Sequence, residues 1–216
     1  MRTVSQVVEE VIAHSPFLAE AIAEDVANNA KVARKIKGEV EKRLLEGVSE
    51  ASIAMALHRL SRELQRPHFG MKYLARMNDV TVRGGLVQFV FPNVSEVADA
   101  LEATSRSAQR KKGAFFTYSS GLHETVLIIG SELEADVRGI LVRQKGLVRT
   151  DGLSAITMHL PEESLSVPGI YYPILKALAL EGISIMEVLS VRTEFSVILE
   201  DKDVDRAFSA IKKITR

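Results

Sequence analysis

The segment "SVPGIYYPILKALALEGISI", residues 166–185, places a Pro-Gly pair directly ahead of an apolar run with helical spacing. Pro168 fixes its own φ, and Gly169 lets the backbone turn tightly or come close to another group. A Gly-Ile pair then ends the run before a β-branched stretch. The pattern predicts a strand-to-helix loop with almost no side chain at its tip. Such a loop either connects two elements tightly or offers backbone amides at a helix start to a small ligand.

Composition limits the classes of protein that this chain can belong to. The 216 residues are 46% hydrophobic, which is enough for one large domain or two to three small ones. The absence of Cys excludes a disulfide framework, thiol catalysis and Cys-built metal sites. The five His residues are scattered without ligand-like pairing, so we expect no metal and no cofactor. No apolar run is long enough to cross a bilayer, and we expect a cytoplasmic location.

The second part of the chain repeats itself at a displacement of about seventy residues. The segment "LVQFVFP" at residues 86–92 aligns with "AITMHLP" at residues 155–161. Likewise, "HETVLIIGSELEADVRGIL" aligns with "RTEFSVILEDKDVDRAFSA". Each copy has the order strand, helix, strand, strand, helix, and a strand at residues 147–149 closes the first copy. The predicted fold class is α+β, with two ferredoxin-like βαββαβ domains at residues 80–150 and 151–216.

The second copy ends without a closing strand of its own. The segment "VTVRGG" at residues 80–85 has strand composition and is not needed within the first copy. We therefore expect it to complete the second copy or to pair with a partner chain, because an unpaired apolar edge invites aggregation.

A small helical domain is predicted for residues 1–66, because residues 3–64 show none of the alternation typical of strands. Ser15 and Pro16 form a typical helix start, and Ser49 is placed to cap a later helix. Residues 67–79 are predicted to be a linker, with Pro67 and Gly70 as helix breakers. Although the net charge of the chain is zero, residues 28–66 carry nine basic side chains against five acidic ones.

The second copy resembles an ACT domain, the ligand-sensing module of aspartokinases and other amino-acid-biosynthetic proteins. The resemblance rests on "SVPGIYYPILKALALEGISIMEV" at residues 166–188 and "TEFSVILEDKDVDRAFSAIKKI" at residues 193–214. The first copy is similar more weakly, since Ala98 and Asp99 stand near the Pro-Gly position. The helical domain followed by tandem repeats also resembles an uncharacterised archaeal ACT-domain family. Because the kinase portion of aspartokinases is missing, the resemblance implies a regulatory protein without catalytic activity.

The resemblance also implies a ligand site, because amino acids bind ACT domains in the crevice between this loop and a facing strand. Carried over to this chain, the ligand-binding residues are Val167, Pro168, Gly169, Ile170 and Tyr171 on the loop, with Ile185, Met186 and Glu187 on the strand. Backbone amides at the helix start suit the ligand carboxylate, while a carbonyl or Glu187 suits its ammonium group. Two alternatives stay open, namely that Glu187 is a solvated strand charge and that Ile170 belongs to the core.

The segment "VSEASIAMALHRLSREL" at residues 48–64 resembles the second helix of a helix-turn-helix, and "NAKVARKIK" resembles its supporting helix. Between them lies "GEVEKRLLEG", which is longer than the compact motif permits. The resemblance implies that Ser49, Glu50, Ser52 and Met55 face base edges and that Arg59, Arg62 and Arg66 contact phosphates. The alternative is a dimerisation or docking domain whose basic residues are solvated.

No group of residues in the sequence predicts catalysis. Asp201 and Asp203 stand where a helix cap is needed, and His123 and Glu124 are adjacent on a strand and so point to opposite faces. Two functions remain. The chain is either an amino-acid-responsive transcription regulator that binds DNA through its N-terminal domain, or a regulatory docking partner of an amino-acid-biosynthetic enzyme that binds no DNA. Both imply an amino acid as small-molecule ligand, a homodimer or higher homo-oligomer, and no membrane.

Overall fold

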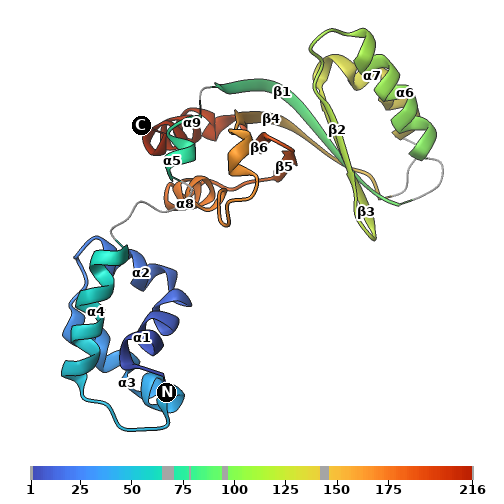
Figure 1. The fold of residues 1–216 in the computed structure, drawn as a ribbon. Helices are drawn as coiled ribbons and strands as arrows, with labels where there is room; N and C mark the ends of the chain where they lie inside the picture. The colour runs from blue at the N-terminus through green and yellow to red at the C-terminus, as the bar shows by residue number, and fades with distance from the viewer. Residues whose placement is uncertain (1, 65–70, 78, 94–96, 142–145, 216) are drawn as a thin grey trace. The chain divides into compact units, whose positions relative to one another are not determined.

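The computed structural model describes residues 2–64, 71–77, 79–93, 97–141 and 146–215 (Figure 1). The chain divides into two compact units, which we call the helical unit, Met1–His68, and the sheet unit, Phe69–Arg216. Within the described ranges, no helix combines the length and the apolar character needed to span a membrane.

The helical unit confirms the helical prediction for this part of the chain. Its helices are α1 (Val4–Ala13), α2 (Pro16–Ala23), α3 (Asn29–Leu44) and α4 (Glu50–Leu64). The Ser49 hydroxyl accepts a hydrogen bond from the Ser52 amide at 3.1 Å, so the predicted cap of α4 is confirmed. The four helices share one core, in which Val8, Ile53 and Leu57 are fully buried.

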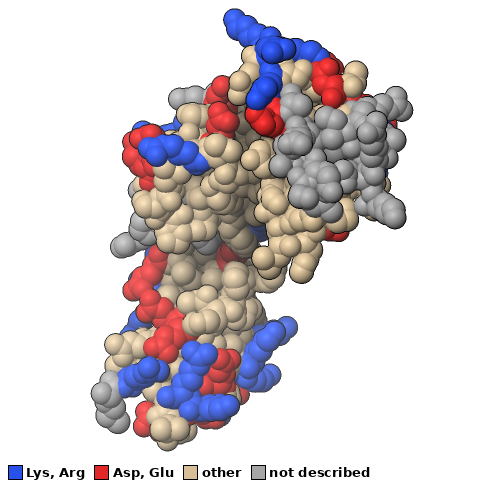
Figure 2. All heavy atoms as spheres, turned by 90° about the vertical axis from the view of Figure 1, so that its right-hand side faces the viewer, with Lys and Arg blue, Asp and Glu red and all other residues tan. Residues whose placement is uncertain are grey.

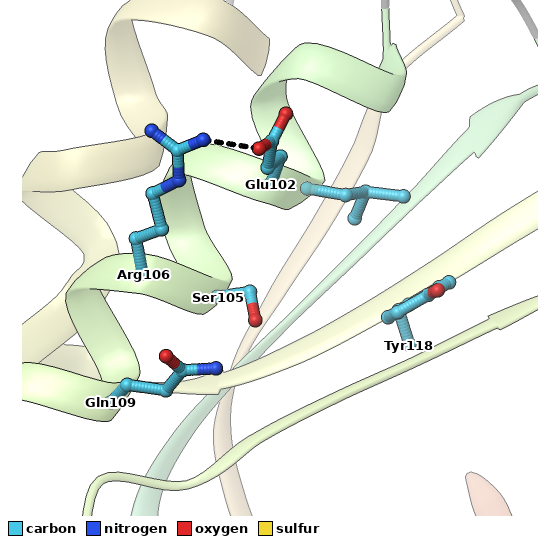
Figure 3. A pocket seen from close by; sticks show the side chains of 6 residues that line it. Glu102, Ser105, Arg106, Gln109 and Tyr118 are labelled. Atoms are coloured by element: carbon cyan, nitrogen blue, oxygen red, sulfur yellow. Dashed lines mark hydrogen bonds and ion pairs between the residues drawn. The ribbon is translucent and has the colours of Figure 1, made fainter.

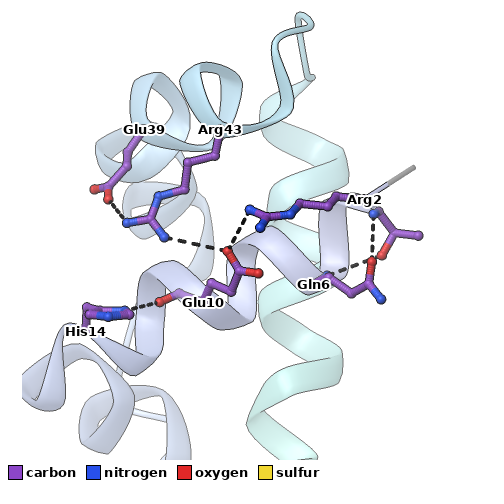
Figure 4. Close-up of polar contacts among 7 residues, drawn as sticks. Arg2, Gln6, Glu10, His14, Glu39 and Arg43 are labelled. Atoms are coloured by element: carbon purple, nitrogen blue, oxygen red, sulfur yellow. Dashed lines mark hydrogen bonds and ion pairs between the residues drawn. The ribbon is translucent and has the colours of Figure 1, made fainter.

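A charged network on the surface of the helical unit links α1 to α3 (Figure 4). The Glu10 carboxylate lies 3.3 Å from Arg2 and 3.8 Å from Arg43, which also pairs with Glu39 on its own helix. The backbone carbonyl of Glu10 lies 2.7 Å from Nδ1 of His14. Because Glu10 and Arg43 are only half-buried and the other side chains are exposed, solvent screens the network, and we expect it to contribute little to stability.

The sheet unit is built on one six-stranded antiparallel sheet with the order β2-β3-β1-β4-β6-β5. Its strands are β1 (Asp79–Pro92), β2 (Phe116–Ser120), β3 (Glu124–Gly130), β4 (Val148–His159), β5 (Glu187–Val191) and β6 (Glu194–Glu200). Its helices are α5 (Met71–Leu74), α6 (Val97–Arg110), α7 (Glu134–Leu141), α8 (Tyr172–Leu180) and α9 (Val204–Ile214), with 3-10 turns η1 (Ser131–Leu133), η2 (Glu162–Ser164) and η3 (Asp201–Asp203). Figure 1 shows α6 and α7 at one end of the sheet, and α8 and α9 at the other.

The two predicted repeats are present, but they share the long strands β1 and β4. In the first repeat, β1 pairs with β3 from Leu86 onward and with the start of β4 at residues 148–150. In the second repeat, residues 79–83 of β1 pair with residues 155–159 of β4. The prediction that residues 80–85 complete the second copy is therefore confirmed over residues 80–83. The predicted boundary between residues 150 and 151 falls inside β4.

Glycines mark the place where the two shared strands change register. The pairing of β1 with β4 shifts between Arg83 and Leu86, which is the signature of a bulge. Gly85 has φ +70° and Gly152 has φ +65°, a backbone region that favours glycine. The sequence predicted separate strand segments at residues 80–85 and 147–149, whereas the structure has continuous strands that run through these glycines.

The predicted linker at residues 67–79 differs from the structure over residues 71–77. These residues include helix α5, and Leu74 and Met77 are buried in the core beneath α8 and α9. They pack there with Ile156 of β4 and Ile174 of α8. This segment therefore belongs to the sheet unit. Residues 67–70 and 78 lie outside the described residues.

Each repeat has its own core beneath its helices, and a further buried group lies on the other face of the sheet. Phe89 and Leu127 belong to the core of the first repeat, whereas Phe195 and Val197 belong to that of the second. Because side chains alternate along a strand, the neighbouring positions point to the opposite face. There Leu86, Ile128, Leu153, Ala155 and Ile198, drawn from both repeats, form one buried cluster. This cluster joins the two repeats.

Candidate functional site

The Pro-Gly loop is a chain of tight turns. After turn η2, the Val167 amide donates to the Ser164 carbonyl at 3.0 Å, and the Ile170 amide donates to the Val167 carbonyl at 3.3 Å. The Tyr172 amide then donates to the Gly169 carbonyl at 2.9 Å. Gly169 has φ +73°, and a side-chain carbon placed on it would meet no atom within 4 Å. The tip of the loop therefore borders open space.

Fewer amides are available at this helix start than the sequence suggested. The amides of Ile170, Tyr172 and Leu175 donate to carbonyls of the loop and the helix start, and Pro173 has no N–H. A ligand carboxylate would thus have to displace these bonds or use the remaining amides of the loop. The simple picture of a helix start with several free donors needs this correction.

Tyr171 anchors the loop to the sheet. Its ring stacks on Phe195 of β6 with centroids 4.2 Å apart and planes at 11°. Its hydroxyl lies 2.8 Å from the Ser190 hydroxyl of β5, within hydrogen-bond distance. Ile170 is 7% exposed and belongs to the core, so the core alternative holds for this residue. The loop therefore has a fixed position relative to β5 even though its tip is open.

The three candidate residues on the strand side do not lie together. Ile185 packs against the same core as Val167 and Tyr171. Met186 is 38% exposed, and its amide donates to the Ile198 carbonyl at 2.8 Å. Glu187 pairs in register with Ile198, whose side chain belongs to the cluster on the opposite face of the sheet. The structure thus brings Ile185 to the loop and separates the carboxylate of Glu187 from it.

Glu187 has a partner that sequence reasoning missed. The side-chain amide of Gln88, on β1, donates to the Glu187 carboxylate at 2.8 Å. Gln88 is only 4% exposed, so this bond satisfies a buried polar group. Burial raises the pKa of Glu187, and the hydrogen bond from Gln88 opposes that effect. Glu187 is thus a half-buried, hydrogen-bonded carboxylate and not a fully solvated charge.

The paired carboxylates that precede α9 have structural partners. Asp201 accepts a hydrogen bond from the Ser154 hydroxyl, and Asp203 lies 3.0 Å from Arg206 on α9. Asp203 occupies the cap position of α9, but its side chain makes no capping hydrogen bond. Among the residues that the structure describes, no group of three or more His, Asp or Glu side chains is placed to hold a metal ion.

The candidate nucleic-acid face of α4 is an exposed stripe. Met55, Arg59 and Arg62 are exposed at helical spacing, and neither Arg has an ion-pair partner within the described part of the chain. Helix α3 continues to Leu44, so only residues 45–49 separate it from α4. The intervening segment that seemed too long for a helix-turn-helix is therefore mostly helix.

The start of α4 is less suited to reading bases. Ser49 and Ser52 lie 2.8 Å apart and are bonded to each other, and Glu50 pairs with Arg34 at 3.4 Å. Arg66 lies outside the described residues. Figure 2 shows Lys and Arg side chains interspersed with Asp and Glu over the helical unit, at the bottom of the view. On the side of the helical unit that Figure 2 displays, which is opposite α4 in Figure 1, the basic residues therefore do not form an unbroken positive surface.

The sheet unit is similar in fold to the regulatory parts of aspartate kinases among solved structures. The chain is similar to aspartate kinase of Clostridium acetobutylicum, with a TM-score of 0.53 and 14% identity over 65% of this chain and 35% of that one. It is also similar to the aspartate kinase regulatory subunits of Thermus flavus and Thermus thermophilus, with TM-scores of 0.51 and 0.50. Both comparisons give 12% identity and cover 65% of this chain and 99% of the subunit.

These likenesses concern the fold. The chain covers about a third of the Clostridium enzyme and nearly the whole of either Thermus regulatory subunit. No protein-family model matches the sequence, and no curated protein matches it. The architecture is thus that of aspartate kinase regulatory domains, preceded by a helical unit.

Proposed function

We propose that this chain is a non-catalytic regulatory protein that senses an amino acid through the Pro-Gly loop of its second repeat. The ligand lies against Val167, Pro168 and Gly169, with Met186 beside it, in a crevice completed by a second copy of the chain. The observation that carries the proposal is the open space beside Gly169, on a loop that Tyr171 ties to β5. The likeness of the fold to aspartate kinase regulatory subunits supports it.

Within this site, the ligand carboxylate meets loop amides and the ammonium group meets backbone carbonyls. Glu187 takes no direct part, because its carboxylate is engaged with Gln88 on the other face of the sheet. Glu187 instead links the strand beside the ligand to the first repeat. Ligand binding changes the balance between two arrangements of the protein only by its difference in affinity for them.

Thermal unfolding of the full chain against the twenty amino acids tests this proposal. A selective ligand at a hundred times its dissociation constant should stabilise the protein by about 2.7 kcal/mol. This stabilisation should raise the melting temperature by several degrees. The variant Gly169→Val should lose that shift, because the new side chain fills the open space beside the loop.

Gly182→Val is the matched control. Gly182 stands at the other end of α8, with φ +67° and no atom within 4 Å of an added side-chain carbon, so both variants carry a similar backbone strain. The Gly182→Val variant should show the same ligand-induced rise in melting temperature as the unchanged protein. A shift that both variants keep, or the absence of a shift with all twenty amino acids, contradicts the proposal.

For the helical unit we propose contact with duplex DNA phosphates through Arg59 and Arg62, which are exposed and form no ion pair within the described residues. Base reading by Ser49, Glu50, Ser52 and Met55 is not part of this proposal, because Ser49, Glu50 and Ser52 have local partners. Arg59→Gln and Arg62→Gln should each lower the salt slope of duplex binding by about one unit. Arg110→Gln, in the sheet unit, serves as the control. Absence of duplex binding at low salt would favour docking on an enzyme instead.

A further inference from the structure

A second open site lies in the first repeat, away from the Pro-Gly loop. It is a groove of about 570 Å³ between α6 and the edge strand β2 (Figure 3). Glu102, Ser105, Arg106 and Gln109 line it from the helix, and Tyr118 faces it from the strand. The volume lies in the range of pockets that hold small metabolites. None of the residues proposed above for ligand binding lines this groove.

Beneath the groove, α6 packs toward the sheet through Leu101, Thr104 and Ala108, and Leu101 also lines the groove. Thr104 is fully buried and Ala108 is partly buried, so neither reaches far across the space beneath the helix. In the second repeat, Tyr171 precedes α8 and its ring stacks on Phe195 of β6.

Helix α6 is held from its other side. Ser107 donates to the Asp136 carboxylate of α7, and Lys111 lies 3.2 Å from the same carboxylate. The hydrogen bond from Ser107 and the one from Lys111 lower the pKa of Asp136, so this carboxylate is ionised and the attachment is maintained near neutral pH. The wall of the groove is therefore positioned by contacts that the groove itself does not use.

The chemistry of the lining selects one class of ligand. Glu102 and Arg106 are one helical turn apart and pair with each other, so the lining carries one negative and one positive charge side by side. A simple anion would be attracted by Arg106 but repelled by Glu102. A simple cation would be attracted by Glu102 but repelled by Arg106. A zwitterion can pair with both groups at once, and the hydroxyl of Ser105 and the amide of Gln109 add hydrogen-bonding capacity.

The strand side of the groove adds a preference for a planar group. Tyr118 pairs in register with Leu127, which belongs to the core beneath α6, so its ring points to the helix side of the edge strand. The ring is nevertheless 54% exposed. An aromatic side chain placed on it would remove apolar surface of both rings from water and gain from stacking.

We infer that this groove binds a free amino acid with an aromatic side chain, its carboxylate on Arg106, its ammonium group on Glu102 and its ring on Tyr118. This site is additional to the one proposed in the second repeat and does not depend on it. The first repeat thus retains a ligand site even though it lacks the Pro-Gly loop.

Isothermal titration calorimetry on the full chain tests the inference with L-phenylalanine, L-tyrosine, L-tryptophan and L-histidine. At least one of them should bind, whereas 3-phenylpropionate and phenethylamine, which carry only one of the two charges, should bind at least about tenfold more weakly. L-alanine, which lacks the ring, should also bind more weakly. Equal binding of either single-charge analogue, or no binding of any of the four amino acids, overturns the inference.

Three variants locate the binding. Arg106 and Glu102 are both exposed and outside the core. Arg106→Gln and Glu102→Gln should each lower the affinity for the aromatic amino acid by about tenfold and leave the melting temperature nearly unchanged. Gly169→Val should leave the affinity for the aromatic amino acid unchanged. If the ligand is lost in Gly169→Val but retained in Arg106→Gln, the binding belongs to the second repeat and the inference about the groove is wrong. The opposite result supports the groove and speaks against the site on the loop for that ligand.

Discussion

At the scale of single residues, the bond between Gln88 and Glu187 is the feature that sequence reasoning could not supply. Gln88 interrupts the apolar run "LVQFVF", and a polar side chain among buried neighbours needs a partner, which is a usable signal. The partner, however, is 99 residues away on a strand at the far side of the sheet. No local pattern in the sequence identifies this partner, and Glu187 entered the candidate ligand set through the family resemblance alone.

The raised pKa of Glu187 gives a prediction about stability and pH. Because burial raises the pKa in the folded state above the unfolded value, the contribution of Glu187 to stability is complete below the unfolded pKa. It is lost as pH rises through the folded pKa. Glu187→Gln removes this titration and keeps a hydrogen-bonding group for Gln88. From about pH 4 to about pH 7, the variant should therefore gain stability relative to the unchanged protein, by less than about 1 kcal/mol.

Urea unfolding at both pH values measures this difference directly. The prediction fails if the variant instead loses stability relative to the unchanged protein as pH rises. That result would mean that the charge of Glu187 is favourable in the folded state and that the bond to Gln88 outweighs the cost of burial.

At the scale of elements, the second repeat was the most predictable part of the chain. The spacing of Ile170, Ile174 and Leu178 indicated the helix that the structure places at α8, and all three side chains are buried. Helix α5 was missed because four residues are too short to show a period. Strands β1 and β4 were predicted as separate shorter pieces because glycines normally interrupt a strand, whereas bulges absorb them here.

The N-terminal half of β1 should be essential for the sheet unit. A chain that begins at residue 71 keeps α5 and all of β1, and we expect it to fold. A chain that begins at residue 86 loses Leu74 and Met77 from the core and leaves residues 155–159 of β4 as an open edge. Each lost core side chain costs roughly 2–5 kcal/mol, which together approaches the whole stability of a typical domain.

Circular dichroism and light scattering distinguish the two chains. The shorter one should be unfolded or aggregated at concentrations where the longer one is folded and monodisperse or forms a defined oligomer. Cooperative unfolding of both chains with similar midpoints would show that residues 71–85 are dispensable for the sheet.

At the scale of the whole molecule, the two units have separate cores. Among the described residues, the core of the helical unit is formed by α1 to α4 and their connections, and the sheet unit has its own buried clusters. We therefore expect the full chain to unfold in two calorimetric transitions, because cooperativity follows shared buried surface. Residues 1–64 and residues 69–216, prepared separately, should each reproduce one of them. One transition for the full chain, at a temperature that neither part reproduces, would show strong coupling between the units.

The strands shared by the two repeats have a consequence for how this architecture is inherited. The second repeat takes its fourth strand from residues 79–83, at the start of the segment that forms the first repeat, whereas residues 148–150 close the first repeat from within its own segment. A gene fragment that encodes only residues 151–216 therefore encodes an incomplete sheet. Loss of the first repeat would leave the second repeat without its fourth strand. The second repeat accordingly depends on the first, although their internal similarity makes them look like two independent units.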